Sequence, residues 1–195
     1  MKKSFRAFFF AALTAVSLQC AAGEMTYKAD DNGNVIYTLM LEELPHSASD
    51  VYGAAKKYFD SAYKHTKYKI TYDSAEDGIV IGTGSFQQFF QGGNVVKVIT
   101  FNVDFQLRVD AKDNRARLQL IAKDYILSTL NDLSANEKTS VSIVTVAPIA
   151  ENKDNKKLYK NAFDAMSELV AKTMNEAAES IRSYTPSVRV SKEDW

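Results

Sequence analysis

Hydrophobic and polar positions follow two different periods along this chain. Apolar side chains recur every three to four residues over residues 51–65 and again over residues 155–183, with charged residues between them. This spacing predicts two amphipathic helices, the second about 28 residues and about 42 Å long. Residues 35–41 are instead a short run of β-forming residues between a turn signal and Pro45, and they predict a strand before the first helix.

Four further strands are predicted between the two helices, over residues 68–72, 79–86, 95–109 and 115–126. The third alternates strictly in its later half, which indicates one covered and one solvent-exposed face. A two-residue turn at Asp113-Asn114 would place Val109 opposite Leu118; a four-residue turn would shift this pairing by two and keep the same faces. The polar face is expected to carry a ladder of cross-strand pairs formed by Asn102, Asp104, Gln106, Arg108, Arg117 and Gln119.

The order strand, helix, four-strand meander, helix predicts an α+β domain of two layers. A curved antiparallel sheet with one apolar face would carry both helices on that face. We assign the domain to residues 24–183, with a long polar insert at 127–155 and a C-terminal tail at 184–195. The β-rich segment 140–146 within the insert is expected to pair, either with this sheet or with another chain.

The first 23 residues have the three parts of a secretory signal peptide. Lys2, Lys3 and Arg6 precede an apolar run at residues 7–18, and small residues follow at 21–23. The alternative is a buried N-terminal helix. The run is shorter than the roughly 20 residues that span a bilayer, and no second run of that length follows. We therefore expect a periplasmic or secreted protein with no transmembrane segment in its mature chain.

Cys20 allows a second form of processing. Acylation of this residue would anchor the mature protein to a membrane, but Gln19 and Ser17 depart from the usual lipoprotein pattern. Otherwise Cys20 leaves with the signal peptide and the mature chain has no cysteine, which suits an oxidising compartment.

Composition excludes several classes of function. The 195 residues contain 24 basic and 24 acidic side chains, so no basic field is available for nucleic acid. One cysteine and two histidines, His46 and His65, lack the spacing of a metal site. No nucleophile motif is present, and we expect neither a cofactor nor catalytic residues.

Several short motifs resemble a family of exported bacterial proteins called domain of unknown function 4468. They are a helix with Tyr52 and Phe59, the strand Ile70-Thr71-Tyr72-Asp73, a Gly82-Thr83-Gly84 strand and the Asp113-Asn114-Arg115-Ala116-Arg117 turn. Asp73 stands one place earlier than the family pattern has it. The resemblance covers residues 35–126 and implies a fold like that of the TATA-binding protein, with no known activity, cofactor or partner. That protein binds DNA on its open sheet face, which export and charge exclude here.

Two features of the second hairpin could carry function. Gly82-Thr83-Gly84 suggests a phosphate loop, but a strand continues after it, so a bulge or a close contact between helix and sheet is the better interpretation. Phe86, Phe89 and Phe90 lie at a strand end, where alternation puts Phe86 and Phe90 on one face and Phe89 on the other. They would form either an exposed partner-binding patch or a cluster covered by the insert or a helix end.

The sequence thus favours an exported, non-catalytic binding module that takes an envelope protein or a small apolar or glycan ligand. An envelope hydrolase acting on glycan or peptide, and a structural lipid-tethered domain, are the alternatives.

Overall fold

The computed structural model describes residues 16–20, 23–63, 69–93, 97–131, 134–143 and 156–186. Within these ranges, two helices, α1 (Ala48–Tyr63) and α3 (Lys156–Arg182), accompany eight strands. The strands are β1 (Val16–Cys20), β2 (Gly23–Ala29), β3 (Val35–Leu41), β4 (Lys69–Ser74), β5 (Ile79–Gly93), β6 (Lys97–Lys112), β7 (Arg115–Asn131) and β8 (Ser134–Val141).

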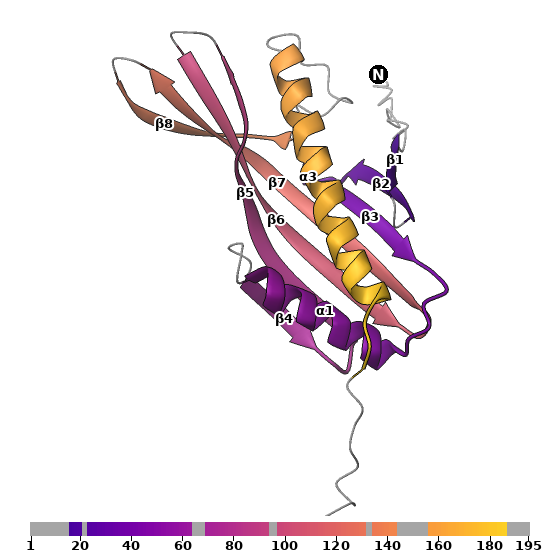
Figure 1. Ribbon diagram of the computed structural model, residues 1–195. Coiled ribbons are helices and arrows are strands. Elements are labelled where there is room, and N and C mark those ends of the chain that lie inside the picture. Colours follow the sequence, from indigo (N-terminus) through magenta and orange to yellow (C-terminus); the bar gives the residue numbers. More distant parts are fainter. Residues whose placement is uncertain are drawn as a thin grey trace, which may run out of the picture.

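All described strands form one antiparallel sheet in the order β1-β2-β3-β7-β6-β5-β4, with β8 added to β7. The long strand β7 has two partners on the same edge, β3 along its first half and β8 along its second half. Beyond the ends of β3 and β4, the sheet therefore continues as an arm built from β5, β6, β7 and β8 (Figure 1).

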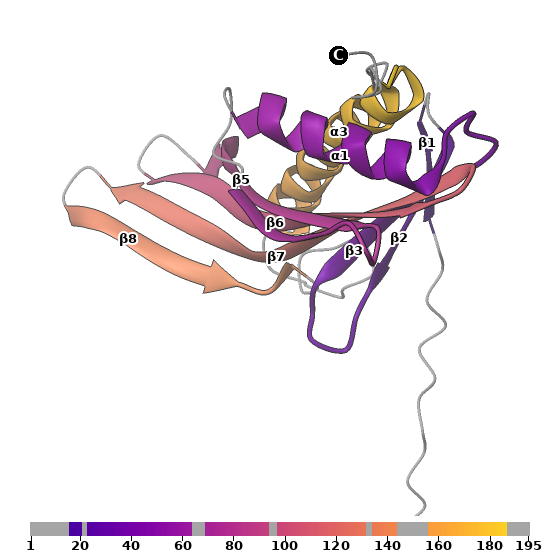
Figure 2. The ribbon, with the colours of Figure 1, turned by 90° about the horizontal axis from the view of Figure 1, so that it is seen from below.

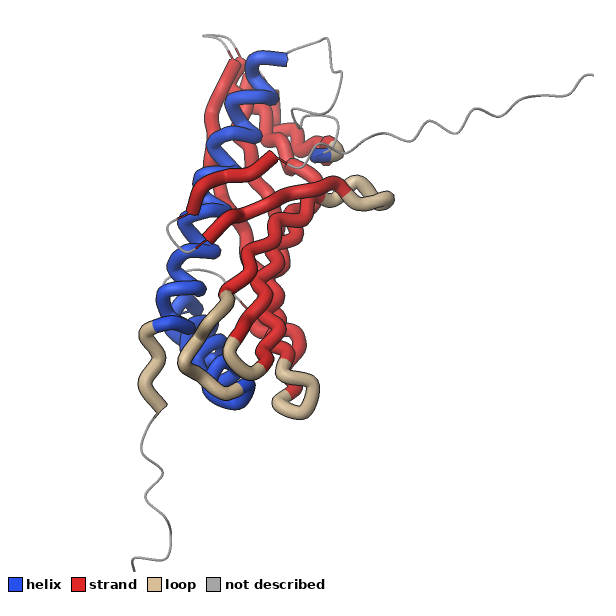
Figure 3. Tube along the Cα trace, turned by 90° about the vertical axis from the view of Figure 1, so that its right-hand side faces the viewer, coloured by secondary structure: helices blue, strands red, loops and turns tan. Residues whose placement is uncertain are grey.

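Both helices pack on one face of the curved sheet, and the other face carries no described helix (Figure 2). The alternation of β6 explains this arrangement, because Phe101, Val103, Phe105, Leu107 and Val109 are all buried beneath the helices. The buried stripe of α3 lies along the sheet and contributes Phe163, Met166 and Val170. Seen from the side, helices and strands form two layers (Figure 3). The predicted fold class and the placement of both helices are confirmed.

The β6–β7 hairpin has the two-residue loop. Val109 pairs with Leu118 and Asp110 with Arg117. Asn114 adopts a left-handed φ of 61°, which asparagine tolerates in tight turns. A shift in register between Val103 and Phe105 prevents the same pairing from continuing along the whole hairpin.

Three segments differ from the sequence-based assignment. Residues 127–131 continue β7 and residues 134–141 form β8, where a polar insert is expected. Of the β-rich segment 140–146, Ser140 and Val141 pair with β7, and residues 144–146 lie outside the described part.

The two ends of the chain are described only in part. Val16–Cys20 pairs with β2 within the segment assigned to a signal peptide, and residues 1–15 lie outside the description. In the C-terminal tail, Tyr184 packs its ring beneath the ammonium group of Lys57 on α1, and residues 187–195 are not described. No helix within the described ranges is long and apolar enough to cross a membrane.

Candidate functional site

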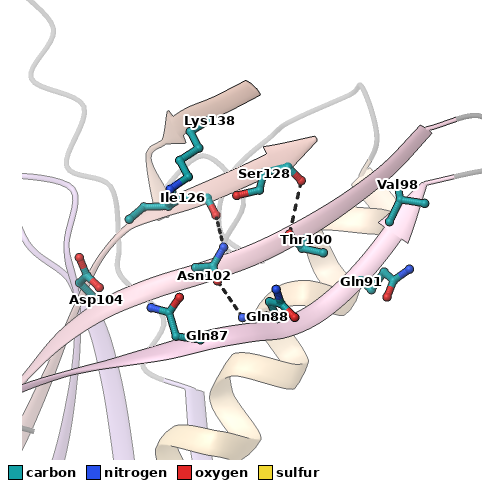
Figure 4. Close-up of a pocket in the computed structure, with 10 residues that line it drawn as sticks. All are labelled: Gln87, Gln88, Gln91, Val98, Thr100, Asn102, Asp104, Ile126, Ser128 and Lys138. Carbon is teal, nitrogen blue, oxygen red and sulfur yellow. Dashed lines mark hydrogen bonds between the residues drawn. The ribbon is translucent and has the colours of Figure 1, made fainter. Parts of the chain in front are cut away.

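A polar groove lies on the open face of the sheet arm, away from α3 (Figure 4). Its cavity volume is about 710 Å³. Strands β5, β6, β7 and β8 all contribute side chains to it, and amides and hydroxyls predominate. The lining residues are Gln87, Gln88, Gln91, Val98, Thr100, Asn102, Asp104, Ile126, Ser128 and Lys138.

A bulge in β5 shapes this groove. Phe86 pairs with Val103 and Phe90 with Phe101, so three residues of β5 face Asn102 alone. Gln88 at the centre of the bulge has a φ of 47°, in the left-handed region. The bulge breaks the alternation of β5 and turns the exposed Gln87 and Gln88 toward the groove.

Asn102 holds the bulge in place from the neighbouring strand. Its side-chain oxygen accepts a hydrogen bond of 2.8 Å from the backbone N–H of Gln88, and its amide nitrogen donates one of 3.2 Å to the carbonyl of Ile126. The residue is only 8% exposed. Its amide thereby links β5 and β7 across β6, and the side chain is positioned by the fold rather than by any ligand.

The same bulge corrects the predicted placement of the three phenylalanines. Phe86, Phe89 and Phe90 are all half-buried against the hydrophobic core, whereas alternation assigned Phe89 to the opposite face. The ring of Phe86 lies 4.4 Å from that of Phe105, Phe89 lies 5.8 Å from Tyr125, and Phe90 lies 5.7 Å from Phe101. These rings extend the core into the arm, and this geometry favours the covered cluster over an exposed patch.

Strand register places four of the lining residues in one row across the sheet. Gln91, Thr100, Ser128 and Lys138 occupy successive strands in one row, because each pairs with the next. Thr100 also donates a hydrogen bond to the carbonyl of Ser128. Figure 4 shows the Lys138 side chain extending toward Ile126, with Asp104 further along β6. Such a row can offer both donors and acceptors to an elongated polar ligand.

Part of the predicted ladder forms on the rest of the open face, around Arg108, Arg117 and Gln119, whereas Asn102 bonds to backbone atoms and no side-chain pair of Asp104 or Gln106 forms among the described residues. Asp110 lies 2.6 Å from Arg108 and 2.9 Å from Arg117, and Gln119 donates to the hydroxyl of Thr38. Burial alone would raise the pKa of Asp110, but hydrogen bonds and charges from the two arginines outweigh it and lower the pKa below its usual value. A second hollow of about 330 Å³ lies beside this carboxylate.

Among the other candidate residues from the sequence, the two histidines and Gly82, structural contacts are made by His46 and Gly82. His46 is nearly buried, and its Nε2 lies 3.2 Å from the carbonyl of Arg182 at the end of α3. His65 lies outside the described residues. Gly82 provides the close contact between helix and sheet, because a Cβ there would lie 2.5 Å from Cε1 of Phe59 on α1. Within the described ranges, no group of three or more metal-binding side chains comes together.

Asp73 joins α1 to the edge strand β4. Its carboxylate accepts a hydrogen bond from the hydroxyl of Tyr52 and lies 2.7 Å from the ammonium group of Lys56. Hydrogen bonds from Lys56 and Tyr52 lower the pKa of this exposed carboxyl. Tyr52 and Asp73, which both belong to the motifs that resemble the family, therefore connect α1 to the sheet.

Part of the groove could be found from the sequence and part could not. Alternation places Asn102 and Asp104 on the polar face, and extending it backward would include Thr100. Gln87 and Gln88 depend on the bulge, which no local pattern predicts. Lys138 depends on β8, which lies in the segment assigned to a polar insert.

Comparison with known proteins supports the fold and supplies no activity. None of the curated proteins matches the chain. A crystal structure of a DUF4468 family protein from Bacteroides ovatus is similar, with a TM-score of 0.52 and 18% identity, over 84% of this chain and 93% of that one. A TBP-like protein from Parabacteroides distasonis gives a TM-score of 0.50 at 16% identity, over 76% of this chain and 95% of that one.

The family comparison agrees with the motifs on α1, β4, β5 and the β6–β7 hairpin. Residues 37–125 match the model of the family described as a domain of unknown function with TBP-like fold. The matched region begins in β3 and ends in β7, so it includes α1 and the meander. Over residues 37–125 the chain therefore matches the DUF4468 family model, and its fold is TBP-like.

Proposed function

We propose that this protein is a non-catalytic binding module and that the polar groove on the open sheet face is its binding site. The observation that carries the proposal is the unused hydrogen-bonding capacity of the groove. Within the described part of the chain, the side chains of Gln88 and Gln91 have no hydrogen-bond partner, although both line the groove. Exposed amides on a fixed sheet offer a preorganised surface, which reduces the entropy lost on binding.

The groove supports binding better than catalysis. Its one described carboxylate, Asp104, forms no ion pair with another described residue, and no histidine is among the described residues that line the groove. Ser85, which pairs with Asp104 across the strands, accepts a hydrogen bond from Gln87. The buried amide of Asn102 is committed to the backbone on both sides. The groove therefore offers recognition groups on a rigid frame, without an activated group aimed at a reacting atom.

We also propose that the protein is exported by its N-terminal signal peptide and works in the periplasm or outside the cell. The positive start, apolar run and small residues of the first 23 positions support this proposal. The intact mass of protein recovered from its host's envelope tests it. A mature N-terminus between Ala21 and Glu24 is expected, a chain retaining Met1 would contradict export, and an acylated Cys20 would favour the tethered alternative.

Binding is tested by nuclear magnetic resonance titration of the isotope-labelled protein with panels of defined peptides and oligosaccharides. We expect saturable shifts in the backbone signals of Gln88, Gln91 and Thr100 with at least one panel. Gln91→Ala should weaken that binding, whereas Gln106→Ala, on the same sheet face outside the groove, should leave it unchanged. Saturable shifts elsewhere only, or none with either panel, would contradict the proposed site. Turnover of a probe would favour the hydrolase alternative.

A further inference from the structure

We infer that the ligand of the groove is an extended peptide segment that carries a basic side chain at its Asp104 end and an acidic side chain at its Lys138 end. This inference rests on the proposed function and names the ligand class for the same groove. Two independent features of the lining residues carry it: the chemistry of the amides, and two opposite charges that lack partners within the described part of the chain.

The amide side chains match a peptide backbone. Each glutamine offers one acceptor and two donors, and an extended peptide presents alternating N–H and C=O groups. Gln88 and Gln91 are free to pair in this way, while Gln87 donates to the hydroxyl of Ser85. Thr100 and Ser128 add hydroxyls on the neighbouring strands. A ligand with regularly spaced amide groups is therefore complementary to this surface.

The two charged residues of the groove have opposite signs and lie apart. Asp104 and Lys138 are both exposed, and neither forms an ion pair with another described residue. Lys138 is in the row of Thr100, two strands away from β6, and Asp104 is four residues further along β6. Strand geometry puts their Cα atoms about 16 Å apart. The long lysine side chain shortens this gap, so a ligand with opposite charges about four residues apart would reach both.

The apolar part of the lining also fits a peptide better than a glycan. Val98 and Ile126 provide two small aliphatic contacts, which suit the side chains of a peptide. The described residues that line the groove include no aromatic ring on which a sugar could stack, since the nearby phenylalanines pack against the core on the other face.

The test uses fluorescently labelled peptides with blocked ends and the purified full chain, measured by fluorescence anisotropy. The parent peptide is Arg-Gln-Thr-Gln-Glu. Two partners replace its arginine or its glutamate with glutamine, and a cello-oligosaccharide serves as the glycan probe. The protein variants are Asp104→Asn and Lys138→Ala, with Asp60→Asn on α1 and Lys172→Ala on α3 as matched controls of exposed residues outside the groove.

Each charge should couple to one end of the peptide. Lys138→Ala should weaken binding of the parent peptide about two- to fivefold and leave the affinity for the peptide without glutamate unchanged. Asp104→Asn should weaken binding of the parent peptide by a similar factor and leave the affinity for the peptide without arginine unchanged. The control variants should bind the parent peptide as the wild type does. This crossed pattern does not depend on which way the peptide backbone runs.

The outcomes separate the inference from the proposed function. Glycan binding that shifts the signals of Gln88 and Gln91, with no peptide binding, would overturn the peptide assignment and keep the groove as the site. Peptide binding whose affinity does not change in the Asp104 and Lys138 variants would overturn the assignment of a basic and an acidic side chain to the two ends of the groove. Binding of neither probe class in the groove would overturn both the inference and the proposed function.

Discussion

Asn102 shows how one buried side chain can determine the shape of a surface. Its side chain accepts a hydrogen bond from the backbone N–H of Gln88 within the β5 bulge and donates one to the backbone carbonyl of Ile126 on β7. Because buried polar groups are costly when unpaired, this asparagine stabilises a backbone conformation that a regular ladder would not adopt. The position of the groove glutamines follows from that conformation.

We predict that Asn102→Ala lowers the free energy of unfolding by about 1–3 kcal/mol, since it leaves the Gln88 N–H and the Ile126 carbonyl without this partner. Urea denaturation monitored by circular dichroism measures the loss. The matched control is Gln106→Ala on the same face of β6, which should change stability by less than about 0.5 kcal/mol. Equal stability of the two variants would show that Asn102 does not hold the bulge.

Asp110 makes part of the stability depend on pH. Its pKa in the folded protein is lowered, so its contribution is fully present above the unfolded pKa of about 3.9 and is lost as the pH falls through the folded value. Asp110→Asn should therefore cost about 1 kcal/mol at neutral pH, and the difference from the wild type should shrink below about pH 4. Denaturation curves at pH 3 to 7 measure it, and a constant difference throughout would contradict the prediction.

At the level of elements, the aromatic residues of β5 link the arm to the core. Phe86, Phe89 and Phe90 contact rings on β6 and β7, and Phe101 also lies 6.0 Å from the ring of Tyr159 on α3. The strands of the arm thus bury one face under the start of α3 and leave the other open. This packing explains why a sheet arm can present a polar groove and still be ordered.

We predict that Phe89→Ser lowers the free energy of unfolding by about 2–3 kcal/mol, because the ring packs against Phe101 and Tyr125. Tyr72→Ser is the control, since that ring is 44% exposed on the open face and its loss should cost less than about 1 kcal/mol. Thermal and urea unfolding measure both. A Phe89 variant as stable as the wild type would instead support an exposed aromatic patch.

The contact between α1 and β5 depends on a missing side chain. Gly82→Ala would push a methyl group into the ring of Phe59, and overpacking of this kind costs about 1–3 kcal/mol. The double variant Gly82→Ala/Phe59→Leu should lose less stability than the sum of the losses of the two single variants. A double-mutant cycle by chemical denaturation measures this coupling, and strictly additive losses would contradict a direct contact.

At the scale of the whole molecule, two parts of one sheet differ in how the helices cover them. Its lower part, formed by β3 to β7, lies under α1 and the end of α3, whereas the arm is covered, among the described helices, by the start of α3 (Figure 1). The strand β1 stands at the far edge of the sheet and pairs only with β2 among the described strands. The other described strands therefore keep their pairing with one another when β1 is removed.

We predict that a chain beginning at Glu24 unfolds with a free energy within about 1 kcal/mol of that of the full chain, because the edge strand β1 pairs only with β2 among the described strands. Urea denaturation of the two purified proteins measures the difference. A loss of several kcal/mol would mean that residues before Glu24 belong to the fold, and it would argue against removal of a signal peptide.

Sequence alone determined the elements and their layers. The period of apolar residues located α1 and α3, and the alternation in β6 assigned every buried apolar residue from Phe101 to Val109 to the helix side. Such patterns are local, and they are visible in the chain because burial repeats with the period of each element. Short motifs around Tyr52, Gly82 and Asp113 were sufficient to suggest the family that the comparison confirms.

Only the tertiary structure decided the groove and the role of the phenylalanines. The bulge at Gln88 depends on a hydrogen bond from Asn102, 14 residues away, and Lys138 reaches the groove only because β8 pairs with the second half of β7. Both are long-range pairings whose stabilisation comes from neighbours in space. A local pattern of polar and apolar residues does not contain that information, so the groove emerges only when the strands are placed side by side.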